Sequence, residues 1–330
     1  MKISCDGFCD LQVNGFAGVD FNNPRATPDE LHRAFAALRA TGVTLALPTL
    51  ITSTLEDFTS CARALMGLGE PAIAGLHMEG PYISPVDGPR GAHLREFVRV
   101  ASRDDFCRRQ DAAGGAIRLV TLAPEVAGAM ELIEYLAAQK IVVAIGHTAA
   151  TPEQIRDAIK AGAKLSMHLG NGCANLLPRH PNFIWEQLAA DELAASFIVD
   201  GHHLPPATVK AMVRAKTPAR SILVTDAMAA AGCAPGRYTI GSAEVELSAT
   251  GRVAAPGASN LAGSSLTMPA AVANTARFTG LPLTEILPMA TKQPAALIGL
   301  RPRGTVSADW DSAAFRLTVR SVSDSPESSP

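Results

Sequence analysis

The sequence lacks several features that would place it in common functional classes. No apolar run reaches the roughly 20 residues that a membrane-spanning helix needs. The charges are balanced, with 29 Lys and Arg against 31 Asp and Glu, so the basic excess typical of nucleic-acid-binding proteins is missing. Asp6 interrupts the N-terminal stretch before any apolar segment, and we therefore expect no signal peptide. These absences predict a protein that binds neither nucleic acid nor membranes.

Paired cysteines and the glycine motif of dinucleotide-binding proteins are missing as well. The six cysteines are scattered, without a Cys-x-x-Cys pair, which is typical of reduced and mostly buried thiols in a cytoplasmic protein. No Gly-x-Gly-x-x-Gly sequence follows an early strand. This counts against an open, doubly wound sheet that binds a dinucleotide.

Two short apolar segments in the middle of the chain each end in a histidine. Residues 141–146 form a β-branched run that leads to His147, and residues 164–167 lead to His168. Between them, Thr151 begins a predicted helix with proline at its first position and a glutamine that completes a capping box. In a parallel sheet both imidazoles emerge at the same edge, where they are candidate metal ligands. The alternative for either histidine alone is a polar group that caps a loop.

Strand-like segments alternate with helical segments about eight times along the chain. This alternation predicts an α/β fold with a parallel sheet, and eight units favour closure into a (β/α)8 barrel of the TIM type. An open doubly wound sheet is the alternative. The predicted strands lie at 8–15, 43–50, 72–76, 117–122, 141–147, 164–168, 195–199 and 221–225.

Polar side chains collect where these strands end, which is the face that carries the active sites of barrels. Glu79, His147 and His168 supply one carboxylate and two imidazoles, a common ligand set for catalytic zinc that leaves one position open. Asp226 suits a general base that later returns its proton to a leaving amine, and His203 suits a group that polarises a carbonyl. Each residue also has a structural interpretation: Glu79 as a helix cap or ion-pair partner, and Asp226 as a turn residue.

Several short motifs around these residues follow one another in a specific order. They are 10–15, 42–44 with 48–49, 75–81, 122–125, 146–148, 200–203, 224–227 and 261–264. In this order they are similar to the motifs of the N-acetylglucosamine-6-phosphate deacetylase family of the amidohydrolase superfamily, and the likeness extends roughly from Gly7 to Gly299.

The resemblance implies that Glu79, His147 and His168 bind one divalent metal per subunit and that Asp226 is the catalytic acid and base. Zinc is the expected metal, with iron, manganese and cobalt as alternatives that the same ligands accept. Many superfamily members carry a His-x-His pair on the first strand for a second metal. Gln12 and Asn14 stand at those places here, so a single metal is expected.

The resemblance also implies contacts to an amino sugar phosphate. His203 matches a histidine that contacts the acetamide. Arg179 matches an arginine that reaches the sugar phosphate bound to a neighbouring subunit, which implies a homodimer, and a guanidinium suits a phosphate. A surface arginine is the alternative. The other expected substrate contacts are Gln12, His93, Asn171, Gly172 and Leu261.

The chain departs from the family pattern on the substrate side and at its ends. Residues 170–173 and 180–182 differ from the family's sequence, which affects the identity of the sugar and the need for a phosphate rather than the hydrolysis. We expect a barrel over 7–300 with a β-like insertion at about 232–260. Segments 1–6 and 301–320 should form the remnant of a small β-sandwich, and 321–330 a disordered tail.

These observations lead to three hypotheses about function. The first is a metal-dependent deacetylase that converts N-acetylglucosamine 6-phosphate, or a close N-acetyl amino sugar phosphate, to acetate and the amine. The second is an amidohydrolase for another N-acyl substrate without the 6-phosphate. The third is a non-catalytic sensor of sugar phosphates, which is disfavoured because Asp226 and both histidines are retained.

Overall fold

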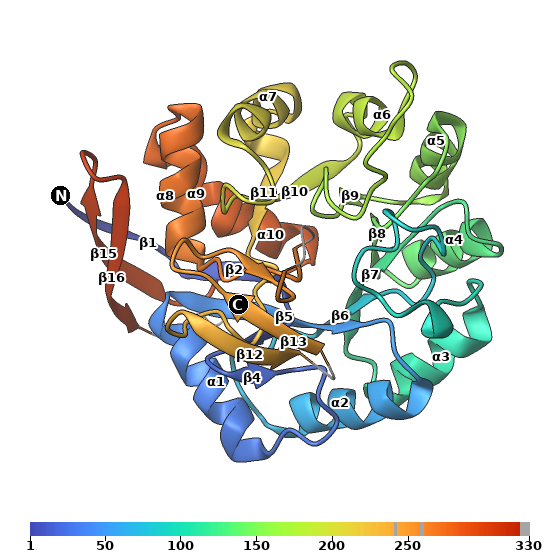
Figure 1. Ribbon diagram of the computed structural model, residues 1–330, viewed down its shortest axis with the longest axis horizontal. Helices are drawn as coiled ribbons and strands as arrows, with labels where there is room; N and C mark the ends of the chain where they lie inside the picture. The colour runs from blue at the N-terminus through green and yellow to red at the C-terminus, as the bar shows by residue number, and fades with distance from the viewer. Residues whose placement is uncertain (241–242, 258–260, 324–330) are drawn as a thin grey trace.

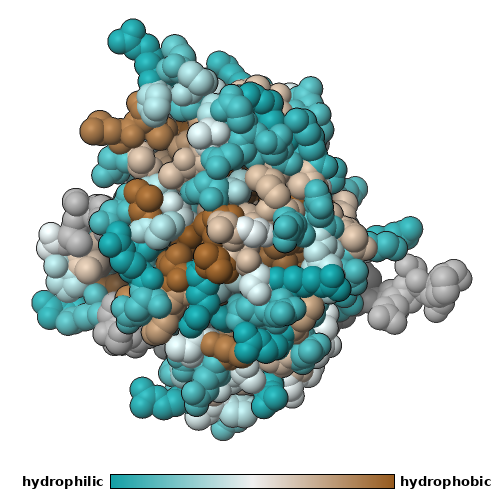
Figure 2. All heavy atoms as spheres, turned by 90° about the vertical axis from the view of Figure 1, so that its right-hand side faces the viewer, coloured by the Kyte–Doolittle hydropathy of each residue, from teal (hydrophilic) through white to brown (hydrophobic). Residues whose placement is uncertain are grey.

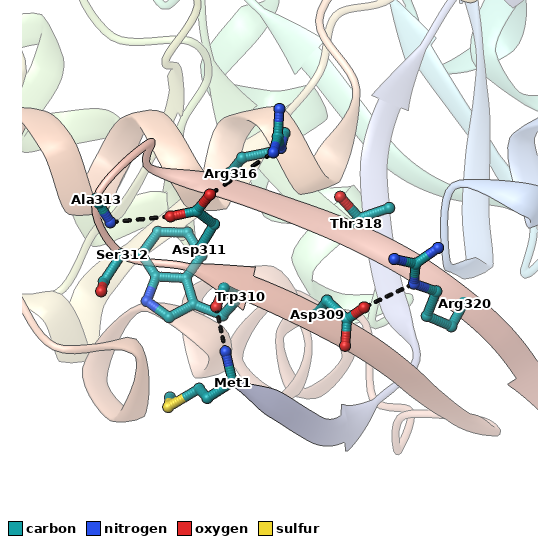
Figure 3. A pocket seen from close by; sticks show the side chains of 9 residues that line it. All are labelled: Met1, Asp309, Trp310, Asp311, Ser312, Ala313, Arg316, Thr318 and Arg320. Atoms are coloured by element: carbon teal, nitrogen blue, oxygen red, sulfur yellow. Dashed lines mark hydrogen bonds and ion pairs between the residues drawn. The ribbon is translucent and has the colours of Figure 1, made fainter.

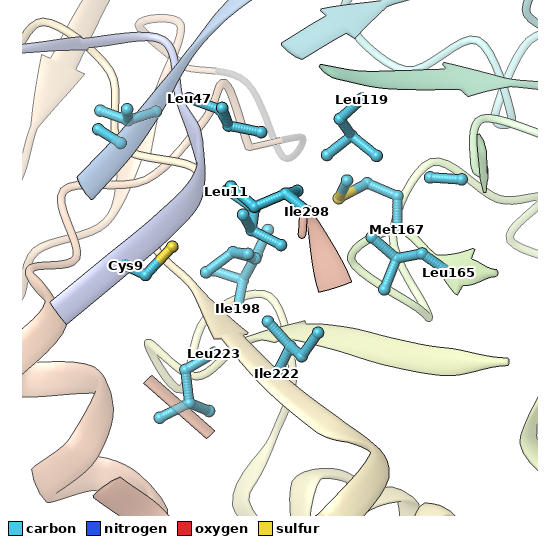
Figure 4. Close-up of a cluster of buried hydrophobic side chains, with 14 of the residues drawn as sticks. Cys9, Leu11, Leu47, Leu119, Leu165, Met167, Ile198, Ile222, Leu223 and Ile298 are labelled. Carbon is cyan, nitrogen blue, oxygen red and sulfur yellow. The ribbon is translucent and has the colours of Figure 1, made fainter. Parts of the chain in front are cut away.

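Eight parallel strands form the central sheet, in the spatial order β11-β10-β9-β8-β7-β6-β5-β2. The structure, a computed structural model, describes residues 1–240, 243–257 and 261–323. The strands of the sheet are β2 (Phe8–Val13), β5 (Val43–Ile51), β6 (Leu76–Glu79), β7 (Ile117–Leu122), β8 (Val142–Ile145), β9 (Leu165–Ser166), β10 (Ala194–Ile198) and β11 (Ser221–Val224). Their buried apolar side chains form one continuous core (Figure 4).

Hydrogen bonds between the first and last strands close the barrel. The Asp226 amide donates to the Gln12 carbonyl at 2.9 Å, and the Asn14 amide donates to the Ala227 carbonyl at 2.7 Å. The buried Asp10 carboxylate accepts hydrogen bonds from the backbone amide and the hydroxyl of Thr225. The predicted (β/α)8 barrel is therefore confirmed.

Helices follow most of the strands and surround the sheet (Figure 1). The predicted capping box of Thr151 with Gln154 is present at α5, and Thr27 forms a second one with Glu30 at α1. The helices are α1 (Pro28–Ala40), α2 (Leu55–Gly67), α3 (Arg103–Ala112), α4 (Ala129–Ala138), α5 (Pro152–Ala161), α6 (Phe183–Ala189), α7 (Pro206–Lys216), α8 (Met268–Thr279), α9 (Leu283–Ala290) and α10 (Lys292–Leu297), with short 3-10 helices η1 (Arg95–Phe97) and η2 (Pro218–Arg220).

Two small antiparallel sheets and a hairpin complete the fold. The hairpin consists of β3 (Gly15–Phe16) and β4 (Val19–Asp20). In the predicted insertion, β12 (Gly236–Ile240), β13 (Ala243–Leu247) and β14 (Val253–Ala254) pair in that order. Val245, Leu247 and Val253 of this sheet form a separate apolar cluster with Met228. The insertion is therefore anchored to the segment that directly follows Asp226.

Strands from both ends of the chain form the other small sheet. In the order β1-β15-β16, β1 (Lys2–Asp6) pairs with β15 (Thr305–Asp311), which pairs with β16 (Arg316–Ser323). Figure 3 shows its ion pairs Asp309–Arg320 and Asp311–Arg316 and the bond from the Met1 amine to the Trp310 carbonyl. The predicted start of the tail at residue 321 was too early, because residues 321–323 pair with β15. Residues 324–330 lie outside the described residues, and the domain boundaries remain a prediction.

The side of the molecule that carries α3, α4 and α5 is mostly hydrophilic, with a hydrophobic patch near its centre (Figure 2). Large apolar side chains are also exposed on loops and helices after β6 and β9. They include Leu94, Leu176 and Trp185, which are 50%, 90% and 56% exposed. Within the described ranges, no helix is both long and apolar enough to cross a membrane.

A buried lysine joins two neighbouring helices, and we expect it to contribute to stability. Lys216 Nζ donates to the Gln187 and Ala190 carbonyls at 2.7 and 2.6 Å, at the C-terminal end of α6. Lys216→Met leaves these carbonyls without their donor and should lower the free energy of unfolding by about 2 kcal/mol. Denaturant titration against the exposed Lys160→Met control measures the loss. An equal loss in both variants would contradict this role.

The pH dependence of that loss has a definite sign. Burial lowers the pKa of Lys216 to about 8, from an unfolded value near 10.5. The unfolded chain therefore binds more protons between pH 8 and 10.5, and the wild-type protein gains stability from this group as the pH rises through that window. Lys216→Met should consequently cost more at pH 10 than at pH 7.

Candidate metal and catalytic site

Three of the predicted site residues stand at the same distance from the end of a strand. His147, His168 and Asp226 each follow the last residue of β8, β9 or β11 by two positions. All three have positive φ angles, of 50°, 28° and 49°. This backbone conformation costs about 1–3 kcal/mol per non-glycine residue and persists only where the surroundings enforce it. The fold therefore holds these three side chains at the carboxyl end of the barrel against a local cost.

Glu79 lies between the two histidines. It is the last residue of β6, and its Oε1 is 3.2 Å from His147 Nε2 and 3.0 Å from His168 Nε2. One ligand atom from each of the three residues lies within 4.8 Å of the others, and all three residues are buried. One carboxylate and two imidazole nitrogens at this spacing fit a single divalent metal.

The imidazole of His147 is held on several sides by two loops. Its Nδ1 donates to the Pro89 carbonyl at 2.9 Å, which leaves Nε2 to face Glu79. The ring of His93 packs edge-on against it, with 4.3 Å between centroids. Gly91 and Gly172 both approach so closely that a Cβ would lie 3.1 Å and 2.9 Å from His147 Cε1. A carbonyl bonded to the distal nitrogen of a ligand histidine fixes its tautomer and its orientation.

Gly172→Ala tests how much this packing matters for metal binding. The new Cβ would lie 2.7 Å from His147 Nδ1, so the imidazole or the loop must shift from its present position. We expect at least a tenfold loss of metal affinity, in the range of other outer contacts to metal ligands. Gly114→Ala is a matched control, because Gly114 has a similar φ of 61° and no atom within 4 Å of its Cβ position. Competition with a chelator measures both affinities, and equal losses would mean that backbone strain alone is responsible.

The charges within the site oppose the effect of burial. Burial alone would raise the pKa of Glu79, but the hydrogen bonds and charge of the two histidines hold it well below its usual value. Burial likewise would lower the pKa of His168, and Glu79 raises it instead. Burial and the negative charge of Glu79 raise the pKa of Asp226 to about 6. Asp226 is thus a carboxylate whose affinity for a proton suits acid and base chemistry near neutral pH.

Strand β2 and the residue that follows it contribute side-chain amides that hydrogen-bond Glu79 and Asp226. Gln12 Nε2 donates to Glu79 Oε1 at 2.9 Å, and Asn14 Nδ2 donates to Asp226 Oδ1 at 2.7 Å. We predicted Gln12 as a substrate contact and did not predict a contact to Glu79. The sequence places Asn14 at the same strand end and predicts no contact between it and Asp226. The sequence does carry one signal for these contacts: Gln12 and Asn14 are two positions apart, so in an extended chain their side chains point to the same side.

His203 is held by an aspartate that sequence reasoning did not assign. Its Nδ1 lies 2.6 Å from Asp200 Oδ2, and both side chains are 8% exposed. Asp200 Oδ1 also accepts hydrogen bonds from the backbone amides of His202 and His203, at 2.8 Å each. The ring is therefore fixed through Nδ1, which leaves Nε2 for another partner. The Asp-Gly-His-His motif at 200–203 contains this aspartate, but the sequence alone predicts a role only for His203.

Comparison of the chain with known proteins identifies its family. The chain matches the Amidohydrolase family over residues 7–312. It belongs to this family. N-acetylgalactosamine-6-phosphate deacetylase from Escherichia coli O157:H7 is 34% identical over 304 residues, which cover 91% of this chain and 79% of the relative. Human N-acetylglucosamine-6-phosphate deacetylase is 35% identical over 326 residues, which cover 94% and 78%.

A solved structure of similar overall shape agrees with this assignment. The crystal structure of N-acetyl-D-glucosamine-6-phosphate deacetylase from Mycobacterium smegmatis aligns with a TM-score of 0.89 at 32% identity, over 98% of this chain and 86% of that one. The family resemblance predicted from the sequence is therefore confirmed.

The remaining predicted substrate contacts of this amidohydrolase lie at varied distances from the cluster. Gly172 and the buried His93 pack directly on His147, and Asn171 Nδ2 donates to the His168 carbonyl at 3.1 Å. Leu261 is half-buried beyond the insertion. Arg179 is exposed, and in the described part of the chain its guanidinium has no hydrogen bond or ion pair with a site residue.

Proposed function

We propose that this amidohydrolase is a metal-dependent deacetylase, which hydrolyses the acetamide of N-acetylglucosamine 6-phosphate or a close N-acetyl amino sugar phosphate. The products are acetate and the amino sugar phosphate. The observation that carries the proposal is the buried cluster of Glu79, His147 and His168 near the hydrogen-bonded Asp226. The deacetylases among its relatives support the substrate class.

Two residues of the chain carry out the proton transfer and the polarisation. Asp226 takes a proton from the attacking water and passes it to the nitrogen as the carbon–nitrogen bond breaks, so that the amine leaves neutral. His203 donates a hydrogen bond to the acyl oxygen, where negative charge develops. A divalent metal at the cluster supplies Lewis-acid activation of water and of the carbonyl when it is bound.

We infer that the site takes one metal ion, with zinc as the first choice and iron, manganese or cobalt as alternatives. The ligand set of one carboxylate and two imidazoles suits each of these ions. Gln12 and Asn14 support a single ion, because they turn amide N–H groups toward the carboxylates. A nitrogen of that kind donates hydrogen bonds and offers no lone pair to a second metal.

On the substrate side, we infer that Gln12, His93, Asn171, Gly172, His203 and Leu261 surround the sugar. We further infer a cytoplasmic homodimer in which Arg179 reaches the phosphate bound to the partner subunit. Its exposure leaves it free to do so, and the exposed Leu176 lies three residues away. Light scattering of the purified protein tests this, and a monomer would remove the role of Arg179.

The experiment that tests the function measures acetate release by metal-loaded protein from three sugars. We expect rapid cleavage of N-acetylglucosamine 6-phosphate or N-acetylgalactosamine 6-phosphate, and far slower cleavage of unphosphorylated N-acetylglucosamine. Equal rates with and without the phosphate would favour the alternative, an amidohydrolase for another N-acyl substrate. Binding of the sugar phosphate without any acetate release would favour a non-catalytic sensor.

A further inference from the structure

Asp226 is held between strand β2 and Ser264, whose amide donates to the Asp226 carbonyl at 3.0 Å. The backbone amide of Asp226 donates to the Gln12 carbonyl at 2.9 Å, and the carbonyl of the next residue, Ala227, accepts from the Asn14 amide at 2.7 Å. The preceding residue, Thr225, is bound through its amide and hydroxyl to the Asp10 carboxylate. Through one side chain and two backbone groups, Asp10, Gln12 and Asn14 thus contact the three successive residues 225–227.

This support is required because the backbone does not fix Asp226 by itself. β11 ends at Val224, and Asp226 has the positive φ of 49° that non-glycine residues rarely adopt. The backbone bonds from β2 fix the position of its Cα. They leave open which way the carboxylate turns, and that choice decides which oxygen meets the substrate.

We propose that Asn14 is the positioning residue that makes this choice, by binding Oδ1 of Asp226 and leaving Oδ2 as the oxygen that carries the proton. The contact is short, with 2.7 Å from Asn14 Nδ2 to Asp226 Oδ1. An amide N–H donates only, so Asn14 cannot take the proton itself and cannot compete with Oδ2 as a base. Among the described residues, Oδ2 has no hydrogen bond, and Asp226 is only half-buried. This inference rests on the proposed function, because it assigns a proton to Asp226.

The oxygen atoms of the two side-chain amides, in Asn14 and Gln12, are consistent with this orientation. Asn14 Oδ1 is buried and has no hydrogen-bond partner among the described residues, and the same holds for Gln12 Oε1. Turning either amide over would bring its oxygen against a carboxylate, which is a repulsive contact. Leaving a buried carbonyl oxygen unpaired costs about 1–3 kcal/mol. This unfavourable term occurs at both amides that donate to a site carboxylate: Gln12 to Glu79, and Asn14 to Asp226.

The variant Asn14→Leu tests the proposal, since it keeps the size of the side chain and the backbone bond to Ala227 but removes the donor. We expect kcat for deacetylation to fall about 100-fold, the loss typical of a misplaced catalytic group, with KM and bound metal unchanged. In an Asp226→Asn background the same substitution should cause no further loss. Retention of kcat within threefold, or a drop of the double variant below detection, would overturn the proposal.

A second measurement does not depend on catalysis. The melting temperatures of wild-type protein, Asn14→Leu, Asp226→Ala and the double variant Asn14→Leu/Asp226→Ala form a double-mutant cycle. We expect the two substitutions together to cost less than the sum of their separate effects, because they remove the same hydrogen bond. Additive effects would overturn the pairing itself. If the cycle shows coupling but no sugar is cleaved, the proposed function fails while the contact stands.

Discussion

Asp226→Asn is expected to lower kcat for deacetylation by about a thousandfold while the protein keeps its metal. General acid and base catalysis by a positioned side chain contributes roughly 10²–10⁴-fold. Asparagine keeps the shape of the side chain and an oxygen that accepts from Asn14, but it cannot take a proton from water. Asp226 does not belong to the Glu79, His147 and His168 cluster. Metal content should therefore stay at the wild-type value.

The control for this prediction is Asp191→Asn, which removes a carboxylate whose side chain is 82% exposed. It should leave kcat and metal content unchanged. Acetate release and elemental analysis on the same preparations give both quantities. If Asp226→Asn retains more than a tenth of the activity, another group is the base and the role proposed for Asp226 is wrong. If it loses its metal as well, Asp226 acts as a ligand rather than as a proton carrier.

The positions of the cluster residues were predictable because they depend on a simple rule. In a parallel barrel every strand ends on the same face, so residues that follow different strands converge whatever their separation in the sequence. Glu79 and His168 are 89 positions apart and lie 3.0 Å from each other for this reason. The periodicity and the capping boxes located these strands and helices closely enough to bring the right residues together.

The surroundings of the cluster were not predictable in the same way. The Pro89 carbonyl reaches His147 from a loop 58 residues away, and no pattern in that loop indicates which backbone atom faces inward. The glycines that pack on the same ring look in the sequence like ordinary loop glycines. Their role depends on the distance between two loops, and a single sequence carries no direct signal for such a distance. Asn14 and Asp200 were missed for a related reason, since they contact other side chains rather than metal or substrate.

The position of Arg179 shows a different limit to what one chain can specify. The family pattern implies that this residue serves a neighbouring subunit, and in one protomer it is an exposed side chain near other exposed groups. Nothing in the packing of the barrel requires an arginine there. A residue that contacts a second copy of the chain makes no corresponding contact within its own chain. For Arg179, only its exposure agrees with the predicted role.

Glu79→Gln is expected to remove the metal and, with it, nearly all activity. The carboxylate is the only negative group in the cluster, and its Oε1 lies 3.0–3.2 Å from both imidazoles. A glutamine at position 79 has the same shape but no charge. Its side-chain amide would face the Gln12 amide, which in the wild-type protein donates to Glu79. We expect metal content to fall at least tenfold and kcat/KM about a thousandfold.

The same substitution has a second effect that separates binding from folding. Without metal, Glu79 still pairs with the buried His168, and removal of one partner of a buried pair costs about 3–5 kcal/mol. Denaturant midpoints of Glu79→Gln should thus lie below those of the wild-type protein even when both are treated with a chelator. The exposed Glu131→Gln should change neither metal content nor midpoint. A Glu79→Gln protein that holds one metal per chain would show that the ion binds elsewhere, and the cluster would then be a structural ion pair of the barrel.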